Sequence, residues 1–284
     1  MTAIGGAMAR LAERMLPHIP AALDGPLAVA LGSLSYRMAA GPRANVRENL
    51  SIVAPELSAP DRERLVRATF IEQVRHYLEL FRIARWDHAT IRRNVTVTGW
   101  DHVVSAYAGG NGVVFASAHL GPISVCGQIF VANGYAVTLP VEEETGEFSR
   151  VINRLRRRMG LTLVYTGSPL GIHRVLKRGG ALGLLADRAV TGVGERVPFF
   201  GQEALIPSAH VALALRTGAS LIPGFAGHRG GRMTALFEPE LVLRRTGDHD
   251  ADLREGVQRW AEILEKHVRA APEQWSVFEA FWRR

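Results

Sequence analysis

The residue best placed for chemistry is His119, which follows a run of small and apolar residues at positions 113–118. Such a run is typical of a buried parallel strand, and open α/β sheets bind ligands at the carboxyl ends of their strands. A helix that begins near Pro122 would direct free amides, near Gly121 to Ile123, at the same spot. We therefore predict a general base beside an oxyanion site, with a purely structural histidine as the alternative.

Acidic residues end two other predicted strands. Asp187 and Arg188 follow the apolar run at 181–185, and three glutamates at 142–144 follow the run at 135–139. The Asp187–Arg188 pair could hold an anionic substrate group, or it could be a surface ion pair. The three glutamates are predicted at the same sheet edge as His119, although such a run is usually a solvated loop.

Two further groups have a structural and a chemical interpretation. Cys126 lies seven residues after His119, on a similar helix face, so it is either a buried apolar residue or a thiol nucleophile. The densest basic run is predicted on a helix, where it either faces solvent or contacts phosphate groups; it comprises Arg150, Arg154, Arg156, Arg157 and Arg158. The other histidines match no metal-ligand spacing, so we predict no metal site.

Composition narrows the class of protein. The 284 residues are 47% hydrophobic and 21% charged, which excludes disordered and fibrous chains. One cysteine cannot form an internal disulfide or a multi-thiolate metal site. The net charge of +7 favours an anionic partner. A phospholipid surface is expected rather than nucleic acid, because no nucleic-acid-binding motif accompanies the basic residues.

The N-terminal region has the pattern of a surface helix. Apolar residues recur at helical spacing over residues 3–16, with charged residues on the other side, which is typical of a helix that lies in a membrane interface or packs on a core; the apolar positions are Ile4, Met8, Leu11 and Met15. The uncharged stretch at 25–35 is too short to span a bilayer, and the pattern does not fit a cleaved signal peptide. We expect a peripheral protein on the cytoplasmic face of the cell membrane.

The elements that must position these residues alternate along the chain. Ser58 begins a helix whose buried stripe is predicted to comprise Val66, Phe70, Val74, Tyr77 and Phe81. Strands are predicted near 95–98, 113–118, 135–139, 161–165, 181–185 and 219–225. Helices are predicted near 122–133, 146–159, 169–178 and 207–217, followed by one or two strands at 233–243 and a helix at 250–269.

This alternation predicts an α/β fold with a mostly parallel central sheet flanked by helices. Residues 1–94 are expected to form a helical, membrane-associating N-terminal subdomain, and residues 95–284 the α/β core. No linker separates the two parts, so one continuous domain is expected.

An ordered set of short motifs resembles the bacterial lipid A biosynthesis (lauroyl/myristoyl) acyltransferases, and among them the phosphatidylinositol mannoside acyltransferases. The motifs are RANVRENL at 43–50, GWDH at 99–102, AHLG at 118–121, LADR at 185–188, PFFG at 198–201, ALRTGA at 214–219 and PEQW at 272–275. The resemblance covers most of the chain. It implies a glycerolipid-acyltransferase-like fold on the cytoplasmic membrane face.

The resemblance also implies an activity, namely transfer of a fatty acyl chain from acyl-CoA or an acyl carrier protein to a hydroxyl of a glycolipid, without a metal or redox cofactor. His119 matches the family's catalytic base. Glu143 and Asp187 match acidic residues of the mannoside enzymes and are expected to bind the acceptor or orient the base. Arg188 would then meet a phosphate group. The oligomeric state is not predicted.

The chain departs from the family at one catalytic position. Family members carry a carboxylate five residues after the histidine, where this chain has Ser124. A hydroxyl can fix the tautomer of His119 but supplies no charge to stabilise the imidazolium. Three outcomes follow: another acid such as Glu143 or Asp187 substitutes, the enzyme is slow, or the protein is a catalytically impaired homologue that binds lipid.

Overall fold

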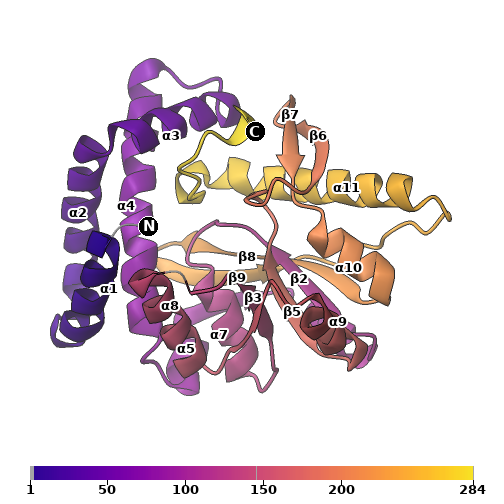
Figure 1. Cartoon of the computed structure of the whole chain (residues 1–284). Helices are drawn as coiled ribbons and strands as arrows, with labels where there is room; N and C mark the ends of the chain where they lie inside the picture. The colour runs from indigo at the N-terminus through magenta and orange to yellow at the C-terminus, as the bar shows by residue number, and fades with distance from the viewer. Residues whose placement is uncertain (1–2, 145, 284) are drawn as a thin grey trace.

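The computed structural model describes residues 3–144 and 146–283, apart from the side chains of residues 3–5 and 8. The predicted positions of Ile4 and Met8 on the first helix therefore lie outside the described side chains. The N-terminal part of the chain is helical and runs along one side of the molecule (Figure 1). Its helices are α1 (Ala3–Met15), α2 (Asp24–Met38), α3 (Ala40–Val53), α4 (Ala59–Ile83) and α5 (His88–Asn94).

In the described residues, a seven-stranded sheet follows, in the order β1-β9-β8-β2-β5-β3-β4. Its strands are β1 (Val95–Thr98), β2 (Val113–Ser117), β3 (Thr138–Val141), β4 (Thr162–Tyr165), β5 (Ala181–Leu185), β8 (Ser220–Arg229) and β9 (Arg232–Phe237). Strand β9 pairs antiparallel with β8, whereas the other pairs are parallel. The mostly parallel α/β fold predicted from the sequence is confirmed.

Helices cover both faces of this sheet (Figure 1). The remaining helices are α6 (Trp100–Ala108), α7 (Ser124–Ala132), α8 (Glu147–Arg158), α9 (Pro169–Lys177), α10 (Ala209–Thr217) and α11 (His249–Ala270). Alternate residues of β2 belong to different hydrophobic clusters, Val113 and Phe115 to one, Val114 and Ala116 to the other. This alternation follows from the two-residue period of a strand and places a core on each face.

A β-hairpin was not expected from the sequence. Strands β6 (Glu195–Phe199) and β7 (Gln202–Ile206) pair antiparallel in a region that the glycines and Pro198 made look like a loop. The two turn residues, Phe200 and Gly201, have φ values of 52° and 75°, the left-handed geometry that suits a two-residue hairpin turn.

Helix α4 begins as predicted, but its buried face differs from the prediction at two residues, because Val74 is only half-buried and Tyr77 is exposed. The hydroxyl of Ser58 accepts a hydrogen bond of 3.3 Å from the amide of Asp61, which caps the helix. Val66, Phe70 and Phe81 are buried, whereas Tyr77 is 39% exposed. Tyr77 does lie on the apolar face of α4, but this part of the face lines a cavity instead of packing against other side chains.

Candidate active site

The register of two parallel strands brings His119 and Asp187 together. Strand β2 lies beside β5, and their last residues, Ser117 and Leu185, are paired. His119 and Asp187 each come two residues later, on the same edge of the sheet. The amide of Ala186 donates to the carbonyl of Ser117 at 2.7 Å, which extends the pairing toward the site.

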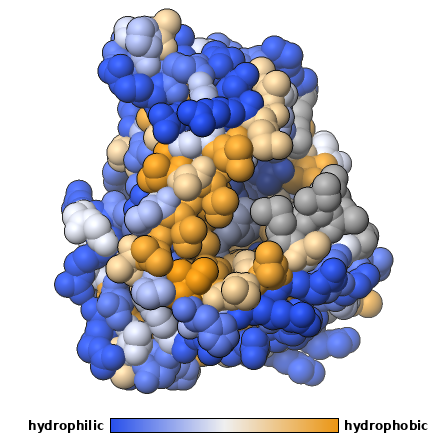
Figure 2. Space-filling model, turned by 90° about the vertical axis from the view of Figure 1, so that its left-hand side faces the viewer, coloured by the Kyte–Doolittle hydropathy of each residue, from blue (hydrophilic) through white to orange (hydrophobic). Residues whose placement is uncertain are grey.

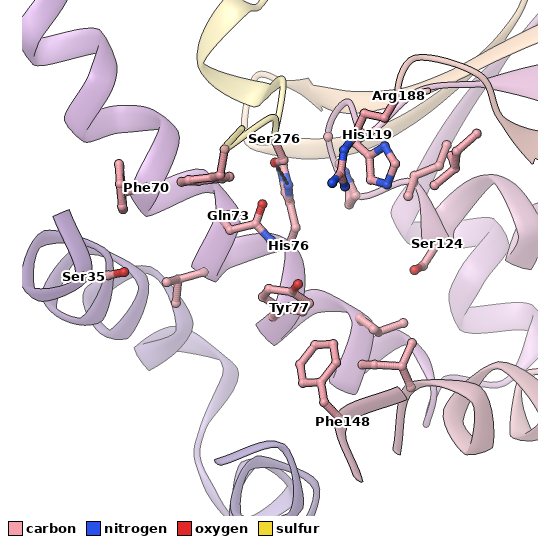
Figure 3. Close-up of a pocket in the computed structure, with 18 of the residues that line it drawn as sticks. Ser35, Phe70, Gln73, His76, Tyr77, His119, Ser124, Phe148, Arg188 and Ser276 are labelled. Atoms are coloured by element: carbon pink, nitrogen blue, oxygen red, sulfur yellow. Dashed lines mark hydrogen bonds between the residues drawn. The ribbon is translucent and has the colours of Figure 1, made fainter. Parts of the chain in front are cut away.

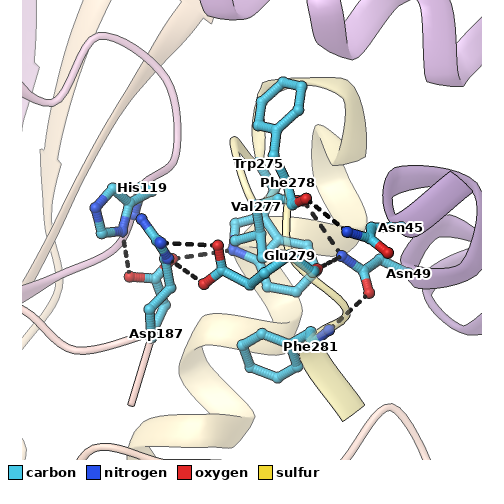
Figure 4. Close-up of polar contacts among 10 residues, drawn as sticks. Asn45, Asn49, His119, Asp187, Trp275, Val277, Phe278, Glu279 and Phe281 are labelled. Atoms are coloured by element: carbon cyan, nitrogen blue, oxygen red, sulfur yellow. Dashed lines mark hydrogen bonds and ion pairs between the residues drawn. The ribbon is translucent and has the colours of Figure 1, made fainter. Parts of the chain in front are cut away.

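His119 and Asp187 form a hydrogen-bonded pair (Figure 4). His119 Nδ1 lies 2.8 Å from Asp187 Oδ1, and the His119 amide donates to Asp187 Oδ2 at 3.0 Å. The indole Nε1 of Trp275 also donates to Oδ2, at 3.1 Å. Asp187 is completely buried, whereas the His119 side chain is 30% exposed. The carboxylate is therefore held from three directions, and the ring keeps an open side.

Asp187 is ionised in this setting. Burial by itself would raise its pKa, but attraction to His119 when that ring is protonated, together with the hydrogen bonds from His119 and Trp275, outweighs burial and lowers the pKa below its usual range. An ionised carboxylate accepts a hydrogen bond, so Nδ1 of His119 carries the proton and Nε2 has the free lone pair. This is the tautomer that a general base requires.

The C-terminal segment supplies part of this arrangement and is itself held by helix α3 (Figure 4). The side-chain nitrogen Nδ2 of Asn49 donates to the carbonyls of Val277 and Glu279, at 3.2 and 2.8 Å. Its side-chain oxygen Oδ1 accepts from the backbone amide of Phe281 at 3.1 Å. Asn45, one turn earlier, donates to the carbonyl of Phe278 at 3.0 Å. The sequence by itself did not indicate a role for Trp275 or Asn49. The one pattern that could have indicated a shared contact is the spacing of Asn45 and Asn49, four residues apart in a helix.

His119 opens onto a cavity of about 570 Å³ between the N-terminal helices and the sheet edge (Figure 3). Its volume is within the usual range for small-molecule sites. Apolar side chains from several elements line much of it, among them Phe70 and Leu80 of α4, Phe148 and Ile152 of α8, and Phe278 of the C-terminal segment. His119 thus faces an apolar space large enough for part of an alkyl chain.

Ser124 is the first residue of α7 and lines the same cavity. Figure 3 shows its hydroxyl apart from the His119 ring, and no hydrogen bond joins the two among the described residues. The predicted oxyanion amides differ from expectation. The Gly121 amide donates to the carbonyl of Gln274 and the Ile123 amide to the carbonyl of Gly121, at 3.0 and 2.9 Å, and Pro122 has no N–H.

The two other predicted substrate contacts lie in different settings. Arg188 lines the cavity and forms an ion pair with Glu279, with Nη2 2.7 Å from Oε2. Glu143 follows β3 at the expected edge of the sheet, but it is exposed and is not one of the residues that line the cavity. Its neighbour Glu144 pairs with Arg157 of α8 at 3.3 Å.

Most of the basic run on α8 is engaged in surface ion pairs. Arg154 and Arg158 pair with Glu13 of α1, and Arg150 pairs with Glu147. Arg156 differs from these residues, because it lines the cavity and donates to Asn153 Oδ1 at 3.1 Å. Burial lowers the pKa of Arg156.

Cys126 belongs to the core and not to the site. Its side chain projects from α7 into a buried hydrophobic cluster, and burial raises the pKa of the thiol to about 12. A protonated, inaccessible thiol is a poor nucleophile. The interpretation of Cys126 as a nucleophile is therefore wrong, and the apolar alternative fits the structure.

Comparison with known proteins gives one family. The sequence pattern of the bacterial lipid A biosynthesis acyltransferases matches residues 10–284. The chain is 26% identical to the phosphatidylinositol mannoside acyltransferase of Mycolicibacterium smegmatis over 253 residues, which are 87% of this chain and 82% of that protein. It is 26% identical to the Mycobacterium tuberculosis enzyme of that name over 262 residues, 88% and 80% of the two chains. Identity to the lipid A biosynthesis palmitoleoyltransferase of Escherichia coli is 23% over 257 residues, 88% and 81%.

Proposed function

Because the chain belongs to the bacterial lipid A biosynthesis acyltransferase family, we propose that it moves a fatty acyl chain from an acyl thioester to a hydroxyl of a glycolipid or related lipid. The chain is an acyltransferase that acts on a lipid acceptor. The donor is proposed to be acyl-CoA or an acyl carrier protein. The observation that carries this proposal is the contact of His119 with buried Asp187 at the mouth of an apolar cavity.

His119 acts as the general base. Its Nε2 takes the proton from the acceptor hydroxyl while the hydroxyl oxygen attacks the thioester carbonyl carbon. The tetrahedral intermediate then collapses, the carbon–sulfur bond breaks, and the leaving thiolate takes the proton back from the imidazolium. Asp187 stabilises the imidazolium through Nδ1, so it performs the task that the family assigns to the carboxylate absent at position 124.

Ser124 has a different task in this proposal. Because it stands at the first turn of α7 and lines the cavity, its hydroxyl can donate to the oxyanion of the intermediate, supported by the positive end of the helix. It replaces the amides of Gly121 and Ile123, which have other partners.

Three charged residues are proposed to contact polar parts of the substrates. Arg188 and Arg156 both line the cavity and can meet a phosphate of the donor or the acceptor, although at Arg188 the phosphate competes with Glu279. Glu143 is exposed just after β3, so it can reach only an acceptor head group that extends outside the cavity.

We further propose that the N-terminal helices rest on the cytoplasmic surface of the cell membrane. Figure 2 shows apolar side chains gathered around a hollow on the face that carries these helices. Exposed apolar residues on α1, α2 and the turns between them include Leu11, Met15, Leu23, Val29, Leu31, Leu34 and Met38. Among the described residues, no helix is long and apolar enough to cross a bilayer. Surface attachment would let acyl chains enter the cavity directly.

The experiment is an acyl-transfer assay with palmitoyl-CoA and a mannosylated glycolipid, following thiol release and the acylated product by mass spectrometry. The His119→Ala variant should be roughly 10²–10⁴-fold slower than wild type, because the general base is lost. The His249→Ala variant serves as a matched control, since His249 is an exposed histidine beside an acid and far along the chain on α11.

Binding and thioester-consumption measurements together distinguish an acyltransferase from a lipid-binding homologue. A catalytically impaired homologue would bind glycolipid without consuming thioester, and His119→Ala would change nothing. Equal rates for wild type and His119→Ala would overturn the role of His119. Thioester consumption that depends on His119 excludes the lipid-binding homologue.

A further inference from the structure

Three side chains with metal-ligating atoms converge between helix α4 and strand β8. They are Glu72 and His76, four residues apart on α4, and His228 on β8. Glu72 Oε2 lies 3.9 Å from His76 Nε2 and 4.0 Å from His228 Nδ1. The three ligand atoms all lie within 4.8 Å of one another, so they face a common point.

The two imidazole nitrogens at this point are buried and have no hydrogen-bond partner among the residues that the structure describes. They are His76 Nε2 and His228 Nδ1. The His76 side chain is only 10% exposed, and that of His228 is 15% exposed. A buried polar atom without a partner costs roughly 1–3 kcal/mol, so its retention calls for an explanation. The two ring centroids lie 6.2 Å apart, with an interplanar angle of 12°.

The opposite nitrogen of each ring is held by a neighbouring residue. His228 Nε2 lies 2.7 Å from Glu79 Oε1, and His76 Nδ1 lies 3.4 Å from the hydroxyl of Ser276. Metal-binding histidines are usually anchored in this way, because a carboxylate or hydroxyl on one nitrogen fixes the tautomer and presents the other lone pair.

We propose that Glu72, His76 and His228 bind one divalent transition-metal ion, with Zn²⁺ as the best match to two imidazoles and one carboxylate. In a tetrahedral Zn²⁺ site the bond lengths of about 2.0–2.1 Å place ligand atoms roughly 3.4 Å apart. The two separations from Glu72, 3.9 and 4.0 Å, therefore need to close by about half an ångström, and the separation between the two histidine nitrogens, which is at most 4.8 Å, by up to about 1.4 Å.

The charges around the cluster suit a cation. Glu72 and Glu79 supply two carboxylates against one nearby guanidinium, that of Arg75, whose Nε is 3.3 Å from Glu72 Oε1. The other oxygen of Glu72 is the one that faces the histidines. Glu273, on the C-terminal segment, adds a further acidic group that acts on Glu72.

The bound ion would tie α4 to β8 behind the wall of the apolar cavity. His76 lines that cavity, and Ser276, which holds His76, donates its amide to the carbonyl of His119 at 2.7 Å. The sequence predicted no metal site because no local spacing suggested one. The cluster forms only when residues 72–79 meet residue 228 in the folded chain.

The test uses the full-length protein without an affinity tag, stripped with a chelator and titrated with Co²⁺ and Zn²⁺. One Co²⁺ per chain should give the visible absorption bands of a tetrahedral site, and one Zn²⁺ should displace it. Glu72→Gln and His228→Ala should abolish the bands. Glu79→Gln, which removes the negative charge that supports His228 but keeps an acceptor oxygen, should weaken metal binding by roughly 10–100-fold.

Two controls locate the ion. The His249→Ala variant should bind metal like wild type. So should His119→Ala, because His119, which also lines the cavity, pairs with Asp187 and not with the Glu72 cluster. The proposal is overturned if wild type shows no tetrahedral bands, or if His119→Ala rather than Glu72→Gln abolishes them. If His228→Ala fails to fold by circular dichroism, the conservative Glu72→Gln variant decides the outcome.

Discussion

At the scale of single residues, the site depends on how Asp187 is held. A completely buried carboxylate would normally become neutral, but three hydrogen bonds, two from His119 and one from Trp275, keep it charged. The same contacts leave Asp187 no other orientation. The imidazole therefore has its negative partner ready before substrate arrives, even though the chain has a serine at the family's carboxylate position.

We predict that Asp187→Asn slows acyl transfer strongly. The amide cannot stabilise an imidazolium and favours the wrong tautomer of His119, a change that costs about 10⁴-fold in a serine protease triad. A loss of 10²-fold or more in kcat is expected in the acyl-CoA assay. Exposed Glu240 provides a matched control as Glu240→Gln. If Asp187→Asn keeps wild-type kcat, the carboxylate is not the partner that His119 uses.

At the scale of elements, the C-terminal segment connects helix α3 to the site. Asn49 makes three hydrogen bonds to the backbone of this segment, and the segment carries Trp275, which contacts Asp187. The amide of Ser276 also bonds to the carbonyl of His119. A buried asparagine on a distant helix therefore helps to fix the positions of His119 and Asp187.

Replacing Asn49 by alanine should lower both stability and activity. The change leaves two carbonyls and one amide of the C-terminal segment without their partner, so the free energy of unfolding should fall by about 2 kcal/mol or more in urea titrations. Asn45→Ala, which removes one such bond, should cost less. Equal effects of the two substitutions would contradict this account of Asn49.

Helix α10 contains a histidine that should make stability depend on pH. His210 is buried against Trp260, and burial lowers its pKa from 6.5 to about 3. Below about pH 6.5 this histidine binds a proton in the unfolded chain but not in the folded chain. The free energy of unfolding therefore falls as the pH drops from about 6.5 toward 3.

His210→Phe should remove this contribution. The slope of unfolding free energy against pH, measured by urea titration between pH 4 and 6, should decrease by about one proton per molecule. His249→Phe, a change at an exposed histidine, is the control. An unchanged slope in His210→Phe would show that another group controls the dependence.

At the scale of the whole molecule, the cavity exists because the N-terminal helices stand beside the sheet edge and do not cover it. Helices α2 and α4 pack together, and α1 packs on α8 through Arg10 with Glu147 and Glu13 with Arg154. The cavity walls then come from α4 and α8 together with the strand ends. The apolar face of α1 and α2 lies on the outside, around the hollow (Figure 2).

We predict that this face binds membranes. The double variant Leu34→Glu/Met38→Glu introduces two charges at side chains that are 51% and 76% exposed, so the fold should tolerate it. Sedimentation with vesicles of phosphatidylglycerol and phosphatidylethanolamine should show at least a 10-fold weaker partition than wild type. The control is Val242→Glu. Val242 is 66% exposed, but it lies on the segment that contacts α11 and not on α1 or α2. Equal partition of all three proteins would contradict membrane binding through α1 and α2.

The sequence alone determined most of the elements and singled out His119 as the candidate base. The apolar runs and their glycine stops predicted the parallel strands and their helices, because strand and helix periodicities are local properties of the chain. The start of β1 at Val95 falls where the predicted helical region ends. His119 could be singled out because a histidine after a buried strand is visible without tertiary contacts.

Tertiary structure alone decided which groups meet. The β2–β5 register selected Asp187 and not Glu143 as the partner of His119, and it is a pairing between segments 68 residues apart. The fold also brings the C-terminal segment onto Asn49 and its Trp275 onto Asp187. It places Glu72 and His76 beside His228. Such contacts depend on strand order and packing, which a local pattern does not encode. The pairing of His119 with Asp187 and the cluster of Glu72, His76 and His228 therefore became visible only in the folded chain.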